Sequence, residues 1–247
     1  MYQKLLPIII IIFLFSLCGY SQKTDSTKSQ IQFSGNINLT NNGVSLVPTF
    51  SLGKPAILID IAIKGKKLSF EPMFNFATEK LRPWGFIFWL RYKLIEKKKF
   101  NLKVGAHPSF VFSASQIIQN GIKKEVLSVN RYFATEIVPN YAVSENTTIG
   151  AYILGANQIG VNTFDPTIFL AFNSVSTVRL SEKYFARIIP QFYFLKLANQ
   201  KGIYSNGTLI LGKKNLPISL NAMVSKSIKT EIEVNKFVWN AGLNYSF

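Results

Sequence analysis

His107 and Ser109 are the residues of this sequence whose types and spacing could carry out a reaction. An imidazole can act as a general base toward a serine hydroxyl, and residues two apart on a β-strand point to the same side. His107 could therefore activate Ser109 as a nucleophile if a third residue oriented the imidazole. The sequence assigns no such residue, and Pro108 would remove a ladder hydrogen bond between the two.

The segments that must position this pair alternate with a period of two, which is typical of β-strands with one apolar face. The clearest case is the C-terminal segment, where one face carries Phe237, Trp239, Ala241, Leu243, Tyr245 and Phe247. Its other face carries small polar residues. The same alternation recurs in segments 57–64, 68–77, 84–94, 168–180 and 216–224.

Composition and the placement of charges decide which solvent the apolar faces meet. The chain has 247 residues, 48% of them hydrophobic, with 28 Lys+Arg against 12 Asp+Glu and one Cys. These values exclude a disordered chain, a disulfide scaffold and a Cys-ligated zinc module. Charges gather in turns such as 64–67, 96–99 and 213–214, whereas the polar faces are rich in Ser, Asn, Thr and Gly. This pattern predicts an all-β, antiparallel up-and-down transmembrane β-barrel that is apolar outward and polar inward.

The first 21 residues resemble an export signal in composition. Lys4 is followed by an apolar stretch over 5–18, and Gly19-Tyr20-Ser21 places small residues at a cleavage site before Gln22. An anchor is the alternative, but about 14 apolar residues span only ~21 Å as a helix against a ~30 Å hydrocarbon core. We therefore predict a cleaved signal peptide over 1–21, a flexible polar leader over 22–29 and the barrel over 30–247. Cleavage would remove Cys18 and Lys4, so the net charge becomes 16 − 1 = +15.

Strand counting predicts a topology. Thirteen segments alternate, near 31–40, 44–52, 56–64, 67–77, 84–95, 100–113, 129–142, 147–157, 166–181, 184–198, 203–212, 215–226 and 234–247. A bacterial barrel with both termini in the periplasm needs an even number of strands, so we predict about twelve. Whether segment 31–52 forms one strand or two stays open. Short connections would then be periplasmic. The longer ones, 78–83, 114–128, 158–165 and 227–233, would be extracellular.

The terminal pattern Trp239-x-Ala241-x-Leu243-x-Tyr245-x-Phe247 resembles the C-terminal recognition signal of outer-membrane β-barrels. The resemblance implies that Trp239, Leu243, Tyr245 and Phe247 are read by the barrel-assembly machinery. Segments 41–55, 82–84 and 105–108 are similar to uncharacterised small barrels of Bacteroidota-type outer membranes. That resemblance implies a location in the cell outer membrane, and the family carries no assigned activity.

The His-x-Ser pair is similar to the catalytic pair of outer-membrane lipid hydrolases, which makes a lipid hydrolase or acyl-modifying enzyme the alternative function. The alternation over 100–112 puts Phe100, Pro108 and Phe112 on the lipid side. His107 and Ser109 then point into the lumen, where acyl chains do not arrive if the lumen is polar. We therefore expect a barrel without catalytic activity, in which His107 is a polar lumen residue.

Charged residues on the predicted inner faces are candidates for lining the lumen. They are Asp60, Glu71, Arg91, Lys93, Lys103, Glu136, Arg179 and, less clearly, Arg187, with His107 beside them. Cations outnumber anions, which favours an anion-preferring pore, unless these ions pair across neighbouring strands. A barrel of about twelve strands lies between the ~8-stranded size that side chains fill and the ~16-stranded porins, so we expect a closed or very narrow interior.

Three functions follow from these features. A passive small-solute channel and a structural barrel whose partner contacts 117–126 are both non-enzymatic and stay open, and the lipid hydrolase using His107 and Ser109 is the alternative. The expected partners are outer-membrane lipids, the assembly machinery and a small solute or anion. No metal, cofactor or nucleic acid is predicted, because no ligand cluster or recognition module is present in the sequence. The oligomeric state stays open.

Overall fold

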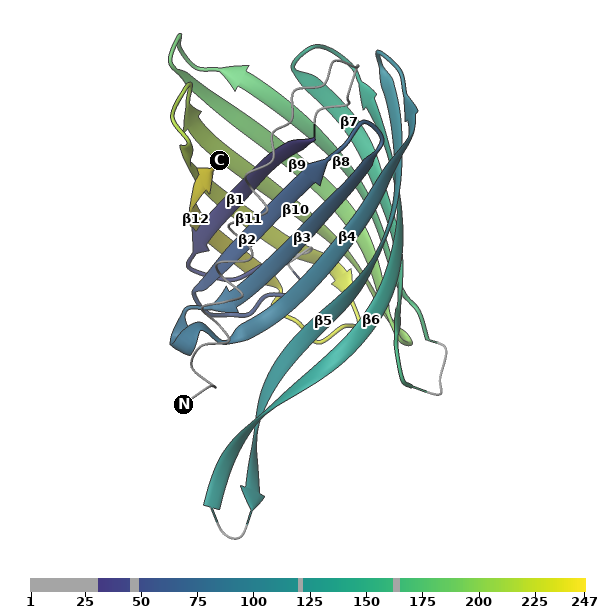
Figure 1. The fold of residues 1–247 in the computed structure, drawn as a ribbon, viewed down its shortest axis with the longest axis vertical. Coiled ribbons are helices and arrows are strands. Elements are labelled where there is room, and N and C mark those ends of the chain that lie inside the picture. Colours follow the sequence, from purple (N-terminus) through teal and green to yellow (C-terminus); the bar gives the residue numbers. More distant parts are fainter. Residues whose placement is uncertain (1–30, 45–48, 120–121, 162–164) are drawn as a thin grey trace, which may run out of the picture. The chain divides into compact units, whose positions relative to one another are not determined.

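A computed structural model describes residues 31–44, 49–119, 122–161 and 165–247 of the chain. In this part twelve antiparallel strands close into a barrel, each paired with its neighbour in sequence and the first with the last (Figure 1). The predicted fold class and the number of strands are confirmed. The predicted signal peptide and leader lie outside the described residues.

The strands account for most of the described chain. They are β1 (Gln32–Thr40), β2 (Ala56–Lys64), β3 (Leu68–Ala77), β4 (Pro83–Glu96), β5 (Phe100–Gln119), β6 (Ile122–Ala142), β7 (Thr147–Gln158), β8 (Thr167–Arg179), β9 (Tyr184–Leu197), β10 (Gln200–Lys213), β11 (Ile218–Thr230) and β12 (Phe237–Ser246). A single 3₁₀ turn, η2 (Glu79–Leu81), interrupts the described strands. No helix in the described residues is long and apolar enough to cross a membrane.

The barrel closes where the first strand meets the last. β1 and β12 pair from Asn36 opposite Ser246 to Thr40 opposite Gly242. Beyond this register, the Phe247 amide donates to the Gly35 carbonyl at 3.0 Å, and the Gly35 amide donates to the Phe247 carbonyl at 2.8 Å. These bonds satisfy backbone groups that an open sheet would leave unpaired at its edges.

Side chains alternate between the outer surface and the lumen as the sequence predicted. On β11 and β12 the large apolar residues are exposed, with Leu220 at 57% and Trp239 at 55%, whereas Ser225 and Asn240 between them are buried. The outer surface is therefore apolar, as a lipid-facing surface requires.

The question of one strand or two over 31–52 is answered by β1 alone, because the described residues 41–44 and 49–52 form no further strand. The backbone of the connection from β1 to β2 closes on itself, because the Gly43 amide donates to the Lys54 carbonyl at 2.9 Å and the Leu52 amide donates to the Gly43 carbonyl at 2.7 Å. Only an isolated bridge from Val44 to Ser51 forms in the described part of this connection.

The expected extracellular loop over 114–128 is instead a continuation of β5 and β6. Their pairing extends to Gln119 opposite Ile122, because the two segments satisfy one another's backbone groups as a two-stranded ribbon. Figure 1 shows this hairpin reaching beyond the other strands at the lower end of the barrel.

We call the two ends of the barrel the termini end, where β1 begins and β12 ends, and the loop end opposite. The connections at the termini end are short and span 65–67, 97–99, 143–146, 180–183 and 214–217. Those at the loop end include the longer 41–55, 159–166 and 231–236. The predicted asymmetry of connection length is present, except at β5 to β6 and at β9 to β10, where only residues 120–121 and 198–199 intervene.

Candidate functional site

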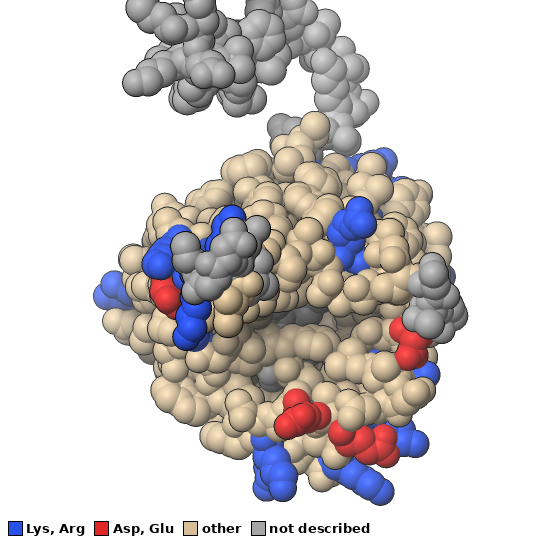
Figure 2. Space-filling model, turned by 90° about the horizontal axis from the view of Figure 1, so that it is seen from below, with Lys and Arg blue, Asp and Glu red and all other residues tan. Residues whose placement is uncertain are grey.

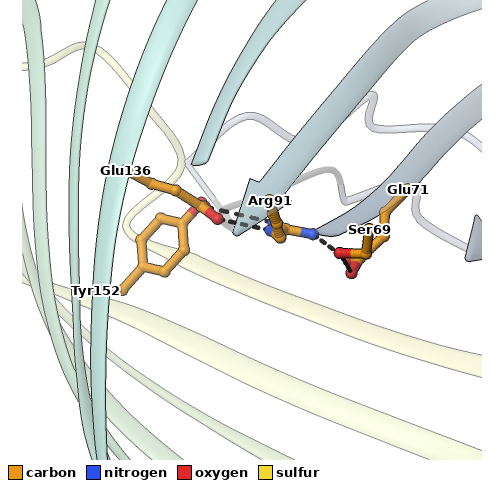
Figure 3. Close-up of polar contacts among 5 residues, drawn as sticks. All are labelled: Ser69, Glu71, Arg91, Glu136 and Tyr152. Carbon is orange, nitrogen blue, oxygen red and sulfur yellow. Dashed lines mark hydrogen bonds and ion pairs between the residues drawn. The ribbon is translucent and has the colours of Figure 1, made fainter. Parts of the chain in front are cut away.

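The inner faces of β3, β4, β6 and β7 bring together an ion network in the lumen (Figure 3). Arg91 lies between two carboxylates, with its Nε 2.6 Å from Glu136 Oε1 and its Nη1 2.5 Å from Glu71 Oε2. The Ser69 hydroxyl donates to Glu71 Oε1 at 2.7 Å, and the Tyr152 hydroxyl donates to Glu136 Oε2. The network therefore holds one guanidinium, two carboxylates and two hydroxyl donors.

Gly105 on β5 makes the central contact of this network feasible. β5 lies between the strands of Arg91 and Glu136, and a Cβ at Gly105 would stand 2.8 Å from Glu136 Oε1 and 3.1 Å from Arg91 Cγ. Any larger residue would occupy the space through which the two side chains meet. A glycine is thus required at position 105, because the side chains of Arg91 and Glu136 pass close to its Cα.

The network is largely closed to solvent. The Glu136 side chain is fully buried, and those of Arg91 and Glu71 are about one-fifth exposed. Buried ions are tolerated when they are paired and hydrogen-bonded, and here every charge has a partner. We therefore infer that this ion network fixes β3, β4, β6 and β7 relative to one another. Tyr152 was missed from the sequence, because a tyrosine within an apolar strand gives no sign of facing a carboxylate.

The lumen mouth at the termini end has the opposite electrostatics. A hollow of about 400 Å³ is lined by Asn146, Thr177, Arg179, Phe185, Arg187 and Lys214. The described residues of its lining include three cations and no acid. Within the part of the chain that the structure describes, none of the three forms an ion pair.

The other expected lumen residues lie on the wall made by β2, β4 and β5. Lys93 and Lys103 stand directly opposite one another in the β4–β5 register, and Lys93 also pairs with Glu96 at 2.9 Å. Asp60 lies opposite Asn36 on β1. The wall thus adds Lys103, the Lys93–Glu96 ion pair and the acid Asp60 beside the network of Arg91.

Much of the lumen toward the loop end is apolar, so the prediction of a polar interior does not hold there. Large side chains pack there across the barrel from several strands, and the buried cluster comprises Ile87, Trp89, Ala134, Leu154, Phe169, Ala171, Tyr193, Leu195, Tyr204 and Ile232. Trp89 is fully buried and Leu195 is 1% exposed. These side chains fill much of the interior at this level.

His107 lies in this apolar half. It is 3% exposed, its ring centroid is 4.0 Å from that of Trp89, and Ser109 beside it is 7% exposed. Among the described residues no hydrogen bond joins His107 to Ser109, and no carboxylate bonds to the imidazole. The pair faces the lumen as its register predicted. Its surroundings, however, are apolar rather than polar, because Ile87 on β4 lies opposite Ser109 and Ala134 on β6 lies opposite His107.

The connection from β1 to β2 reaches into the lumen at the loop end. Thr49 Oγ1 lies 2.8 Å from Tyr193 Oη on β9, across the barrel. Thr49 and Ser51 line both a cavity of about 460 Å³ and a smaller one of about 210 Å³. This connection therefore divides the lumen at its loop end.

The same connection is tied to the barrel rim by a surface ion pair. Lys54 Nζ lies 3.2 Å from Glu79 Oε2 in η2, and its hydrogen bond holds the pKa of the Glu79 carboxyl below its ordinary value. The described residues contain no group of three or more His, Cys, Asp or Glu that could hold a metal ion.

Comparison with known proteins identifies structural relatives only. No protein-family profile matches the chain, and no curated protein matches it in sequence. Among solved structures, a KdgM porin matches with a TM-score of 0.54 at 12% identity, over 87% of this chain and 99% of that one. The chain has a porin-type barrel fold.

Two further structures support that assignment of the fold. A KdgM porin in complex with disordered oligogalacturonate has a TM-score of 0.53 at 12% identity, over 87% of this chain and 98% of that one. A NanC porin has a TM-score of 0.52 at 6% identity, over 87% of this chain and 99% of that one. At these identities the likeness concerns the fold.

Proposed function

We propose that this protein is a narrow outer-membrane channel for small solutes, with a preference for anions. The observation that carries the proposal is the mouth at the termini end, where Arg179, Arg187 and Lys214 surround a hollow that has no acidic residue among the described residues of its lining. Unpaired cations at a pore mouth raise the local concentration of anions and lower their entry barrier.

The opposite wall supports the same preference. Lys93 and Lys103 add positive charge, whereas the carboxylates of Glu71 and Glu136 are already bonded to Arg91. A passing anion would therefore meet the cations of the mouth and Lys103 first, and the neutralised carboxylates next. The apolar packing farther along the lumen keeps the route narrow, which favours small solutes over large ones.

The solute class follows from the charge of the mouth. Oligogalacturonate, the ligand in one KdgM porin structure, is a chain of sugars that each bear a carboxylate. At 12% identity that ligand does not transfer to this chain, but it indicates a suitable probe. We propose small carboxylates, with galacturonate as the test solute.

Planar-bilayer recording of the purified protein tests the channel. Under a KCl gradient we expect discrete conductance steps and a reversal potential shifted toward the chloride equilibrium potential. Galacturonate should block the current or permeate. Arg179→Gln combined with Arg187→Gln should shift the reversal potential toward zero, whereas Lys98→Gln in the turn 97–99 should not. Absence of conductance, or selectivity for potassium, would refute the proposal.

We further propose that the barrel resides in the outer membrane of a Bacteroidota-type cell, exported by residues 1–21, with its termini end in the periplasm. The terminal strand would both present the assembly signal and close the barrel at Gly35 and Phe247. Deletion of Phe247, or Tyr245→Asp, should impair insertion while export continues. Tyr184→Asp is the matched control, and normal heat-modifiable protein from both terminal variants would contradict the role.

A structural or interaction barrel is the second candidate, and the β5–β6 hairpin is the observation that favours it. The hairpin extends beyond the barrel rim, and its Ile118 is 74% exposed. Deletion of 117–126 should leave conductance intact and abolish co-purification of a partner if this function holds. The hydrolase alternative predicts acyl hydrolysis that is lost in Ser109→Ala. We expect no acyl hydrolysis from either the wild type or this variant.

A further inference from the structure

The larger cavity at the loop end has the properties of a binding site. Its volume is about 460 Å³, within the range of about 300–1,000 Å³ typical of small-molecule sites. Most of its wall is apolar, including Trp84, Ile87, Phe110, Leu154 and Leu197. Among the described residues, no Lys, Arg, Asp or Glu lines it.

One polar group in the cavity, the imidazole of His107, has an incomplete set of hydrogen-bond partners. His107 is 3% exposed, and its one hydrogen-bonding contact among the described residues is with the Pro108 backbone, which leaves a ring nitrogen without a partner. Ser109, 7% exposed, lies two residues along the same strand and lines the same cavity. Buried polar groups are normally hydrogen-bonded, so an imidazole in this position indicates that a bound molecule supplies the bond.

We propose that this cavity binds an uncharged, mainly apolar molecule that bears one hydroxyl group, in the class of phenols and medium-chain alcohols. The apolar wall would hold the body of the molecule, and His107 would bond its hydroxyl. An anion would be disfavoured, because no cation lines the cavity and an unpaired buried charge is costly. This site goes beyond the proposed channel function and does not depend on conduction.

The loop end also offers a route of entry. Figure 2 shows a hollow at the centre of this end, bordered by residues without charge, while Lys, Arg, Asp and Glu stand around the rim. The uncharged described residues around this hollow would suit the approach of an apolar solute. The anion-binding mouth lies at the other end of the same lumen.

Tryptophan fluorescence can detect binding, because Trp84 lines the cavity and the Trp89 ring contacts His107. Trp239→Phe removes the remaining tryptophan, which is exposed on the outer surface. In this background we would titrate 4-bromophenol, a quencher that is neutral at pH 7, against 4-bromobenzoate, an anion of similar size. We expect saturable quenching by the phenol and at least about tenfold weaker quenching by the benzoate.

Variants separate a site from partition into detergent. Ala156→Leu fills the cavity and should weaken phenol binding by about tenfold or more, whereas Ala222→Leu on the outer face of β11 should not change it. If Ala156→Leu fails to fold, as judged by heat-modifiability, Ala134→Val provides the same test. Linear quenching that does not saturate, or equal binding in the filled and control variants, would overturn the proposal.

His107→Phe tests the hydrogen bond. The substitution keeps an aromatic ring against Trp89. It should therefore weaken the binding of 4-bromophenol by about tenfold, while bromobenzene should bind equally to both proteins. Unchanged phenol binding would refute the role of His107. None of these measurements uses conductance, so a failure here leaves the channel proposal standing, and a silent bilayer recording leaves this one standing.

Discussion

Toward the termini end the lumen is walled by ions, with Arg91 bonded to Glu71 and Glu136. Toward the loop end the same barrel is walled by packed apolar side chains, with Trp89 and Leu195 almost fully buried. The change occurs within single strands, over two residues. On β4 the inward residue Trp89 is followed by Arg91, and their side chains touch, with Arg91 Cζ 4.2 Å from the indole centroid.

This difference shows that alternation determines which way a residue points but not what chemistry it meets. On β6 Ala134 precedes Glu136, and Glu136 lies at the level of Arg91, because both residues pair with Gly105 of the intervening β5. On β7 the change lies one step farther toward the termini end, since Leu154 pairs with Glu136 and Tyr152 is the next inward residue. A polar solute and an apolar solute would each find a compatible surface, at opposite ends of one lumen.

The largest expected effect comes from placing a charge in the wrong half. Leu154→Glu buries an unpaired carboxylate in the apolar cluster and should cost roughly 4 kcal/mol or more. Thr177→Glu places the same side chain beside Arg179 and Arg187, so it should change stability by less than about 0.5 kcal/mol. Urea unfolding in lipid vesicles measures both, and equal losses would mean that the two halves do not differ.

The second prediction tests the ion network from within. Arg91→Met removes the single cation between two carboxylates and should destabilise the barrel by about 3 kcal/mol, because both acids lose their partner. Arg187→Met at the open mouth removes a cation without an ion pair among the described residues, so its unfolding curve should coincide with wild type. Coincident curves for both variants would show that the network does not fix the strands.

The sequence predicted more of this arrangement on the outside than on the inside. Alternation identified the strands and the lipid-facing residues such as Leu220 and Trp239, because lipid imposes one chemistry on that face. The inner face has no such uniform solvent. The pairing of Arg91 with Glu136 spans an intervening strand, so it depends on register that only the closed barrel defines.

A signal for the apolar half was nevertheless present in the sequence. In segment 84–90 both faces are apolar, since Ile87 and Trp89 lie between Phe86, Phe88 and Leu90. Continuous apolar runs within otherwise alternating strands indicate that the inner face is apolar there. The inward reach of Thr49 was beyond prediction, because its partner Tyr193 lies far away in sequence.

A third prediction concerns the one residue whose size permits the network. Gly105→Ala would place a Cβ 2.8 Å from Glu136 Oε1, so the ion pair must shift, at a cost of about 1–2 kcal/mol. Gly155→Ala on β7 is the matched control, since no atom would lie within 4 Å of its Cβ. A stability loss shared by both variants would point to backbone effects instead of the network.

The smallest expected effect tests the contact that divides the loop end. Tyr193→Phe removes only the hydroxyl that meets Thr49, because the ring can keep its stacked position 4.8 Å from that of Tyr204. Stability should fall by about 1 kcal/mol, the net contribution of one hydrogen bond. Thr49→Val should have the same effect, and the double variant should cost no more than either single change, since both remove one bond. Additive losses in this cycle would show that the two hydroxyls do not bond one another, and the connection from β1 to β2 would then be held in the lumen by packing alone.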